Sequence, residues 1–590
     1  MATEAHPRTS LENSPASPFK WPAPPEMKDK RYPKPQGLGM RAAAASGRSR
    51  ALPGPFGSEY NLGKARGVMS RMASALGEES VSMRSGLKYR YGLLAAVLLG
   101  AQLAGVSAAE APRLADAAAK QDKAALRALI RDKADVNAPQ ADGATALHWA
   151  VHWDDQESVD LLIRAGANVN ARNEYSATPL SLACTNGNAA IVEKLLAAGA
   201  NPNAAAASGE TPLMRCARTG DVAAVKSLLA RKADVNARDN EQGQTALMWA
   251  VAEKHPAVAQ ILVQAGADIG ARSKGGFTPL LFASRVGDVE SAKIFLAGGA
   301  NVNEAGPKGM TPLLLASASG QEALGIFLLD KGADPNARDS AGVTSLHYAL
   351  MKGITALNEI RFANYVEYLF RPNMEDLVKA LLAHRANPNL RIEKRIALGG
   401  GHSDEVLGAT PFLLAAATPD PVAMRMLASA GADPKLKTKD GSTALMLAAG
   451  LTRGQDFTEE DKRVSLDAVK IAVELGADID AANEDGLTAM HGAASNGADG
   501  VVQFLAQKGA KLDVRDKYQQ TPLSIATGVR LPWIPNGDEL GEIIQPSTRD
   551  LLLKLGATHL DTPGYFHPPA EDSEAYRINR GVRGLETPGK

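Results

Sequence analysis

Residues 278–303 show the spacing of apolar and polar positions that recurs through most of the chain. After Thr278-Pro279, the apolar residues Leu280, Leu281 and Ala283 fall on one side of a short helix. Threonine is a favoured N-cap, and proline in the first turn loses only an N–H that would be unpaired there. A second apolar group follows at helical spacing: Val289, Ala292, Ile294, Phe295 and Leu296. The pattern predicts two helices, separated at Gly287-Asp288.

The threonine that begins this pattern recurs at a nearly constant interval. Seven copies of a T-[AP]-L-like tetrapeptide are 33 or 34 residues apart, and four more follow with steps of 66, 33, 45 and 33. They begin at Thr145, Thr178, Thr211, Thr245, Thr278, Thr311, Thr344, Thr410, Thr443, Thr488 and Thr521. After most of them comes a G-A-D/N-x-N element, as in Gly332–Asn336. One helix pair cannot bury both of its faces, so the units must stack.

These motifs resemble the ankyrin repeat, over about residues 112–560. A more polar first unit starts at Pro112, where a cap exposed to solvent is expected. The resemblance implies an all-α solenoid of about twelve helix-turn-helix units with β-hairpin-like loops. Departures from the period predict insertions near 354–372, 391–409, 451–463 and 530–546. Asn358–Phe370 is rich in aromatic residues and is expected to add a helix.

The segment before the repeats has the pattern of a signal sequence. Residues 1–82 hold ten of the 34 prolines without a helical or strand period, and we interpret them as a disordered extension. Basic residues 84–90 precede an apolar run from Gly92 to Val106 and small residues at 107–109. Residues 83–109 are therefore expected to be a signal peptide, cleaved after Ala108 or Ala109, with translation starting at Met83. Alternatively, residues 91–109 remain as a membrane anchor. Both interpretations place the repeats outside the cytoplasm.

Charge and cysteine content exclude some classes of function. Lys+Arg and Asp+Glu both number 65, but residues 1–82 carry 12 basic and 7 acidic residues, so residues 110–590 are acidic overall. Nucleic acid is therefore not expected as a partner.

Only two cysteines are present, Cys184 and Cys216, near the same place in consecutive first helices. We expect buried free thiols, because a disulfide needs closer Cα atoms than adjacent units usually provide. Residues 561–590 form a polar tail.

Few residues suggest catalytic or metal chemistry. His148 and His152 lie four residues apart with Asp154 and Asp155 nearby, which could form half of a metal site. The histidine of the TALH motif is, however, structural in the ankyrin family, so we favour that role. Residues 399–405 contain three glycines but lack the lysine of a phosphate-binding loop. No catalytic motif is present, and we predict no enzymatic activity, cofactor or metal.

The remaining candidate is a surface. The ankyrin resemblance implies that partners contact the ends of the first helices and the loops before each threonine, on one concave side. The positions that this resemblance selects for partner binding are His152, Trp153, Arg172, Tyr175, Arg218, Arg272, Phe277, Arg285, Met310 and Lys352. Met351 also falls at a helix-end position. Trp149 and Trp249 occupy a usually apolar position and are expected in the core.

The sequence thus predicts a monomeric, non-enzymatic scaffold that binds an unidentified protein partner. The signal pattern favours a periplasmic or secreted location. A membrane-anchored adaptor is the first alternative, and an enzyme or metal-binding protein that uses the inserted loops is the second.

Overall fold

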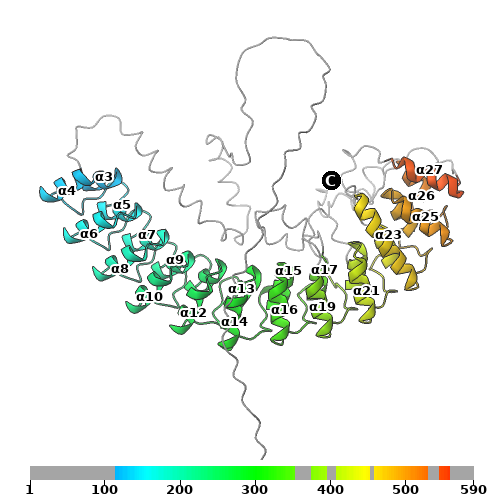
Figure 1. Ribbon diagram of the computed structural model, residues 1–590, viewed down its shortest axis with the longest axis horizontal. Helices are drawn as coiled ribbons and strands as arrows, with labels where there is room; N and C mark the ends of the chain where they lie inside the picture. The colour runs from blue at the N-terminus through cyan, green and yellow to red at the C-terminus, as the bar shows by residue number, and fades with distance from the viewer. Residues whose placement is uncertain (1–112, 352–373, 395–406, 452–457, 529–543, 559–590) are drawn as a thin grey trace, which may run out of the picture. The chain divides into compact units, whose positions relative to one another are not determined.

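The computed structural model describes residues 113–351, 374–394, 407–451, 458–528 and 544–558. In these residues the regular elements are α-helices and one 3-10 turn, η1 (Pro307–Gly309), and the only β pairing is a bridge between Arg338 and Thr344. The helices form twelve consecutive pairs (Figure 1). The pairs are α3 (Leu114–Ala119) and α4 (Lys123–Arg131), α5 (Ala146–His152) and α6 (Gln156–Arg164), α7 (Pro179–Asn186) and α8 (Ala189–Ala197), α9 (Pro212–Thr219) and α10 (Val222–Ala230), α11 (Ala246–Ala252) and α12 (Pro256–Gln264), α13 (Pro279–Val286) and α14 (Val289–Ala297), α15 (Pro312–Ala318) and α16 (Glu322–Asp330), α17 (Ser345–Leu350) and α19 (Glu375–Ala383), α20 (Pro411–Ala417) and α21 (Pro421–Ser429), α22 (Ala444–Ala448) and α23 (Glu459–Glu474), α24 (Ala489–Ser495) and α25 (Asp499–Gln507), and α26 (Pro522–Ala526) and α27 (Pro546–Leu555).

From α5 onward, the first helix of each pair begins at the predicted threonine, and α7–α8 shows how the local sequence sets the helix ends. The Thr178 hydroxyl accepts a hydrogen bond from the Ser181 backbone N–H at 3.1 Å and so caps α7. Gly187 ends α7 with φ of 71°, a left-handed conformation that glycine adopts without strain. The Asn188 side chain then accepts from the Ile191 N–H at 3.1 Å and caps α8. Local capping therefore fixes where both helices start and where the first one stops.

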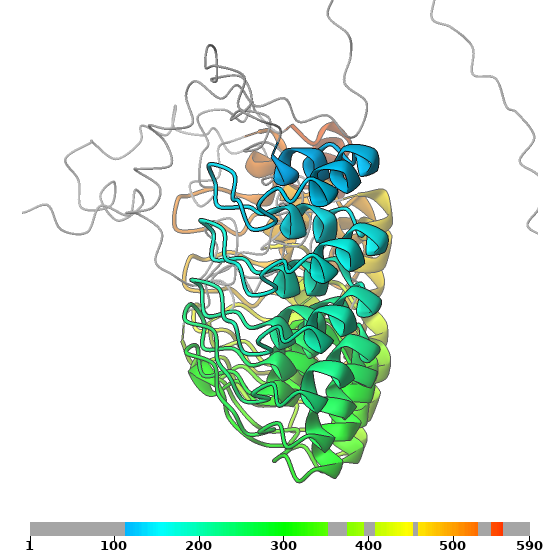
Figure 2. The ribbon, with the colours of Figure 1, turned by 90° about the vertical axis from the view of Figure 1, so that its left-hand side faces the viewer.

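The pairs stack on their immediate neighbours. Helix α5, for example, packs on its own partner α6 and on the first helices α3 and α7 of the flanking pairs. Small and branched residues on α5, including Ala146, Leu147 and Val151, are completely buried between these neighbours. First helices lie beside first helices, second helices form a separate row, and the loops project from the side of the first helices (Figure 2). The prediction of an all-α solenoid is confirmed.

Asparagine side chains join successive loops in the same way at several interfaces. The Asn303 amide donates to the Gly332 carbonyl at 3.2 Å, and its Oδ1 accepts from the Asp334 N–H at 2.8 Å. We call the set of residues that make both bonds the asparagine ladder: Asn137, Asn170, Asn203, Asn236, Asn303, Asn336 and Asn389. Gly270 and Lys435 occupy this position in two other units, where no side chain can make these bonds. Both bonds are therefore missing at these two interfaces, whereas Asp480 and Asp513 keep the acceptor bond alone, from the N–H groups of Lys511 and Thr558.

Most of the predicted insertions lie outside the described residues, as does the proposed helix at 358–370. Parts of three insertions are described, and one of them lengthens a helix: α23 has 16 residues, whereas most other second helices have nine. Thr458 caps it, accepting from the Asp461 N–H at 3.1 Å. This insertion therefore lengthens a helix instead of adding only a loop.

The cysteines differ from the prediction. Cys184 on α7 and Cys216 on α9 form a disulfide, with Cα atoms 4.6 Å apart, and both side chains are fully buried. The expectation of free thiols was wrong, because these two first helices approach closely enough here for the bond. Among the described helices, none has the length and apolar character needed to span a bilayer, and residues 83–109 lie outside the described part.

Candidate protein-binding surface

The structure describes all but one of the predicted contact residues. Lys352 lies outside the described residues. His152, Arg218 and Arg285 lie in the last turn of their first helices, and Trp153 follows directly after α5. The others are in the loops: Arg172, Tyr175, Arg272, Phe277 and Met310. Met351, which the sequence also placed at the surface, is only 4% exposed, because it packs into the core at the end of α17.

Trp153 and Tyr175 are exposed aromatic residues, as expected. Tyr175 is 58% exposed and Trp153 is 40% exposed. The Trp153 indole N–H donates to the Ala119 carbonyl at 3.2 Å. The centres of the Trp153 and His152 rings are 4.7 Å apart. Tyr175 lies in the loop before α7, whereas Trp153 lies at the far end of α5. The two therefore belong to opposite edges of the stack and do not form one patch.

The loop arginines also bond to neighbouring loops. Arg172 donates to the Ala205 carbonyl at 2.9 Å, and Arg272 pairs with Glu304. Arg338 pairs with Glu393 at 2.7 Å. These side chains remain partly exposed, so they stabilise the row of loops and still offer a charged edge to a partner.

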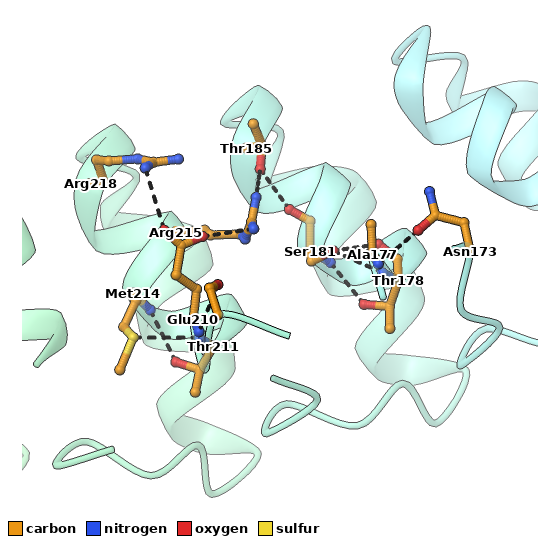
Figure 3. A network of polar contacts seen from close by, with 11 residues as sticks. Asn173, Ala177, Thr178, Ser181, Thr185, Glu210, Thr211, Met214, Arg215 and Arg218 are labelled. Atoms are coloured by element: carbon orange, nitrogen blue, oxygen red, sulfur yellow. Dashed lines mark hydrogen bonds and ion pairs between the residues drawn. The ribbon is translucent and has the colours of Figure 1, made fainter. Parts of the chain in front are cut away.

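Three charged residues, two on α9 and one just before it, form a polar cluster on this surface (Figure 3). We call Glu210, Arg215 and Arg218 the arginine cluster. One Glu210 oxygen lies 2.7 Å from the Arg215 guanidinium, and the other lies 3.9 Å from that of Arg218. Arg215 also donates to the Thr185 hydroxyl at 3.1 Å and so connects α9 to α7. The cluster thus holds two positive charges against one carboxylate.

Aromatic rings continue this surface toward α13. The Arg218 guanidinium lies 5.1 Å from the centre of the Trp249 ring, and that of Arg285 lies 5.4 Å from the centre of the Phe282 ring. Such distances allow cation–π attraction. Phe277 packs edge-to-face on Phe282, with ring centres 6.0 Å apart. The predicted contact residues Arg218, Phe277 and Arg285 each lie against an aromatic ring, Trp249 or Phe282, that the sequence did not select as a contact residue.

The two tryptophans that were expected in the core also border this surface. Trp149 and Trp249 pack against the core, but part of each side chain remains exposed. Their position, four residues after the threonine, is occupied by Arg215 in another unit and by Leu182 in a third. This change from apolar to charged residues at one position was the sequence signal that the position is partly exposed, because a fully buried position would not tolerate arginine.

The structure assigns His148 a structural role. Its Nδ1 accepts from the Thr145 backbone N–H at 3.1 Å, which leaves Nε2 to donate to the Ala177 carbonyl at 3.0 Å. Burial lowers the pKa of this imidazole, so it is neutral at physiological pH. Both ring nitrogens are occupied, and no cluster of three potential metal ligands occurs in the described ranges. The glycine-rich segment at 399–405 lies outside them.

A row of capped helix pairs with exposed helix ends and loops defines a repeat solenoid of the kind that serves protein interaction. A family model described as ankyrin repeats (3 copies) matches residues 114–206, 180–273, 280–370 and 462–530. Together these ranges include more than half of the 590 residues, and the chain belongs to the ankyrin-repeat family.

Individual relatives are similar over shorter stretches. B-cell lymphoma 3 protein of Homo sapiens is 35% identical over 119 residues, which are 20% of this chain and 24% of that protein. Ankyrin repeat domain-containing protein 63 of Homo sapiens is 35% identical over 127 residues, 20% of this chain and 30% of that protein. Ankyrin repeat and MYND domain-containing protein 1 of Mus musculus is 36% identical over 105 residues, 18% of this chain and 10% of that protein. The matches thus span less than a third of each of these relatives.

Proposed function

We propose that this chain is an exported scaffold that binds a protein partner through the first-helix side of its repeats. The observation that carries the binding role is the row of partly exposed residues Arg218, Trp249 and Arg285 on the first helices α9, α11 and α13, with the Arg285 guanidinium packed over the buried Phe282 ring. Arginine and aromatic residues provide most of the binding energy at protein interfaces. Trp153 and Tyr175 extend the candidate surface to both edges of the stack.

The proposed export rests on two features. Residues 83–109 have the basic, apolar and small-residue order of a signal peptide. The Cys184–Cys216 disulfide favours an oxidising compartment, because thiols are kept reduced in most cytosols. We propose the bacterial periplasm or the exterior, with an uncleaved anchor at 91–109 as the alternative.

We further propose that the scaffold is monomeric and not an enzyme. Each helix pair is stabilised by the pairs before and after it, so folding needs no second copy.

Affinity capture with the full-length exported protein tests the binding role. Wild type, Trp153→Ala and Tyr175→Ala are compared with Val422→Ala, an exposed apolar residue on the second helix α21. We expect partner recovery to fall in the first two variants and not in the third. Equal recovery from all of them would remove Trp153 and Tyr175 from the binding surface.

N-terminal sequencing of the mature protein tests export separately. A mature chain that begins at Ala109 or Glu110 is expected. A chain recovered from the cytoplasm that retains residues 83–109, with reduced cysteines, would contradict it.

A further inference from the structure

Arg218 is held in place without a hydrogen bond from its guanidinium. Its side chain is only 13% exposed, and its one charged neighbour is the Glu210 carboxylate at 3.9 Å. No described residue accepts a hydrogen bond from its side chain. The Arg218 backbone carbonyl is engaged, because it accepts from His255 Nε2 at 3.0 Å. A guanidinium has five N–H donors, so this group retains nearly all of its hydrogen-bonding capacity.

Trp249, which lies under this guanidinium, is unsatisfied as well. Its indole N–H is buried and has no acceptor among the described residues. Trp149 occupies the same position in an earlier unit, and its N–H donates to the Gln140 side chain at 2.7 Å. The residue that corresponds to Gln140 is Asp239, because the backbone N–H of each bonds to the carbonyl of the residue before the threonine. The Asp239 carboxylate accepts from the backbone N–H groups of residues 241–244 instead of from Trp249. The Trp249 N–H and the Arg218 guanidinium are therefore two neighbouring donor groups without a hydrogen-bond acceptor among the described residues.

The charges at this place are also unbalanced. Arg215 and Arg218 share Glu210, whose closer contact, 2.7 Å, is with Arg215. The next charged residues along the same row are Glu253 and Arg285, which are opposite in sign. Within the arginine cluster itself, two guanidinium groups therefore face one carboxylate.

We propose that the Arg218–Trp249 site binds the side-chain carboxylate of an aspartate or glutamate in an extended segment of the protein partner. The guanidinium donates to the carboxylate oxygens, and the exposed part of the Trp249 ring supports the adjacent aliphatic atoms. The first-helix side continues in both directions with partly exposed residues, Trp149 on α5 and Arg285 on α13. The segment therefore passes through the site, and the carboxylate belongs to an internal residue and not to a chain end. This inference rests on the proposed binding role and specifies the chemistry of the partner.

The test uses a display library of random linear peptides, selected on the immobilised full-length protein. We expect the enriched peptides to share one acidic residue at a fixed position. Each selected peptide is then synthesised with a fluorophore in two forms, acidic and isosteric amide. Its binding to wild type, Arg218→Gln and Arg425→Gln is measured by fluorescence polarisation. Arg425 is the matched control, because it lies on the second helix α21 and pairs with Glu474.

The amide form is expected to bind wild type and Arg425→Gln at least about tenfold more weakly than the acidic form, the value of one charge-assisted hydrogen bond. For Arg218→Gln the two forms should bind alike. The comparison of the two peptides on wild type does not depend on how any variant folds.

Enriched peptides without a shared acidic residue, or an equal acid-to-amide difference in Arg218→Gln, would overturn the inference. A further variant, Trp249→Ala, separates this failure from that of the proposed function. If Trp249→Ala abolishes peptide binding while Arg218→Gln does not, the surface binds protein but not through a carboxylate. If both variants bind like wild type, the first-helix side is not the binding surface.

Discussion

Removal of the Cys184–Cys216 disulfide should destabilise the repeats by a calculable amount. The bond joins residues 32 positions apart and closes a loop that contains α8 and the start of α9. The loss of unfolded-chain entropy for a loop of this length corresponds to roughly 3.7 kcal/mol at room temperature. Both sulfur atoms are fully buried between α7 and α9, so replacement by alanine also leaves a small cavity.

Urea unfolding of the full chain, followed by circular dichroism without reductant, measures the effect. The double variant Cys184→Ala/Cys216→Ala should lose about 3–4 kcal/mol of unfolding free energy from the transition that includes α7–α10. Because the pairs depend mainly on their neighbours, distant pairs such as α24–α25 should be affected much less.

Reductant provides the control. A reducing agent should lower the stability of wild type to nearly that of the double variant and should leave the variant unchanged. Two titratable thiols in the unfolded, unreduced wild type, or equal stability of the two proteins, would refute the reasoning.

Three other outcomes follow from named contacts. Burial lowers the pKa of His347 and of His491 to about 4, below the value near 6.5 of an unfolded histidine. As the pH falls, these histidines are therefore protonated in the unfolded chain before they are protonated in the folded one. The unfolding free energy should be at its full value above pH 6.5 and should fall as the pH drops toward 4. The loss should be about 2 kcal/mol per histidine at pH 5, and a His347→Gln variant that kept the full pH dependence in urea unfolding would contradict this. Gly270→Asn should raise the unfolding free energy by about 1–2 kcal/mol over Gly270→Ala by restoring the missing ladder bonds; equal stability of the two variants would count against it. Gly270 is not left-handed, and an added Cβ would come no closer than 3.4 Å to Asp268. Asn303→Ala should lower the unfolding free energy by about 1–2 kcal/mol in the same assay, because it removes both hydrogen bonds of the Asn303 side chain. An unchanged unfolding free energy would show that these two bonds contribute nothing to stability.

Much of the fold was predictable because its determinants are local. Thr178 and Asn188 cap helices through residues three positions away, and those signals recur at a fixed period. The same period located the insertions, although not their structure. What the period could not supply was the spacing between particular helices. The distance that permits the Cys184–Cys216 bond depends on how α7 and α9 pack, not on either helix alone.

The candidate surface was predictable in position but not in detail. The register of the repeats selected Arg218 and Arg285, since both occupy the same place in their units. It could not show that Arg218 lies over Trp249, because that contact joins two units whose relative placement a sequence period does not specify. Met351 was misjudged for a similar reason, as neighbouring side chains cover it.

The two interruptions of the asparagine ladder have a mechanical consequence. If the ends of the repeat row are pulled apart, tension passes from one loop to the next through the paired bonds of Asn303 and its equivalents. At Gly270 and at Lys435 no such bonds share the load, so the helix contacts must carry it alone. In single-molecule stretching, the row should separate first at these two points, and the three segments that they delimit should then extend as blocks.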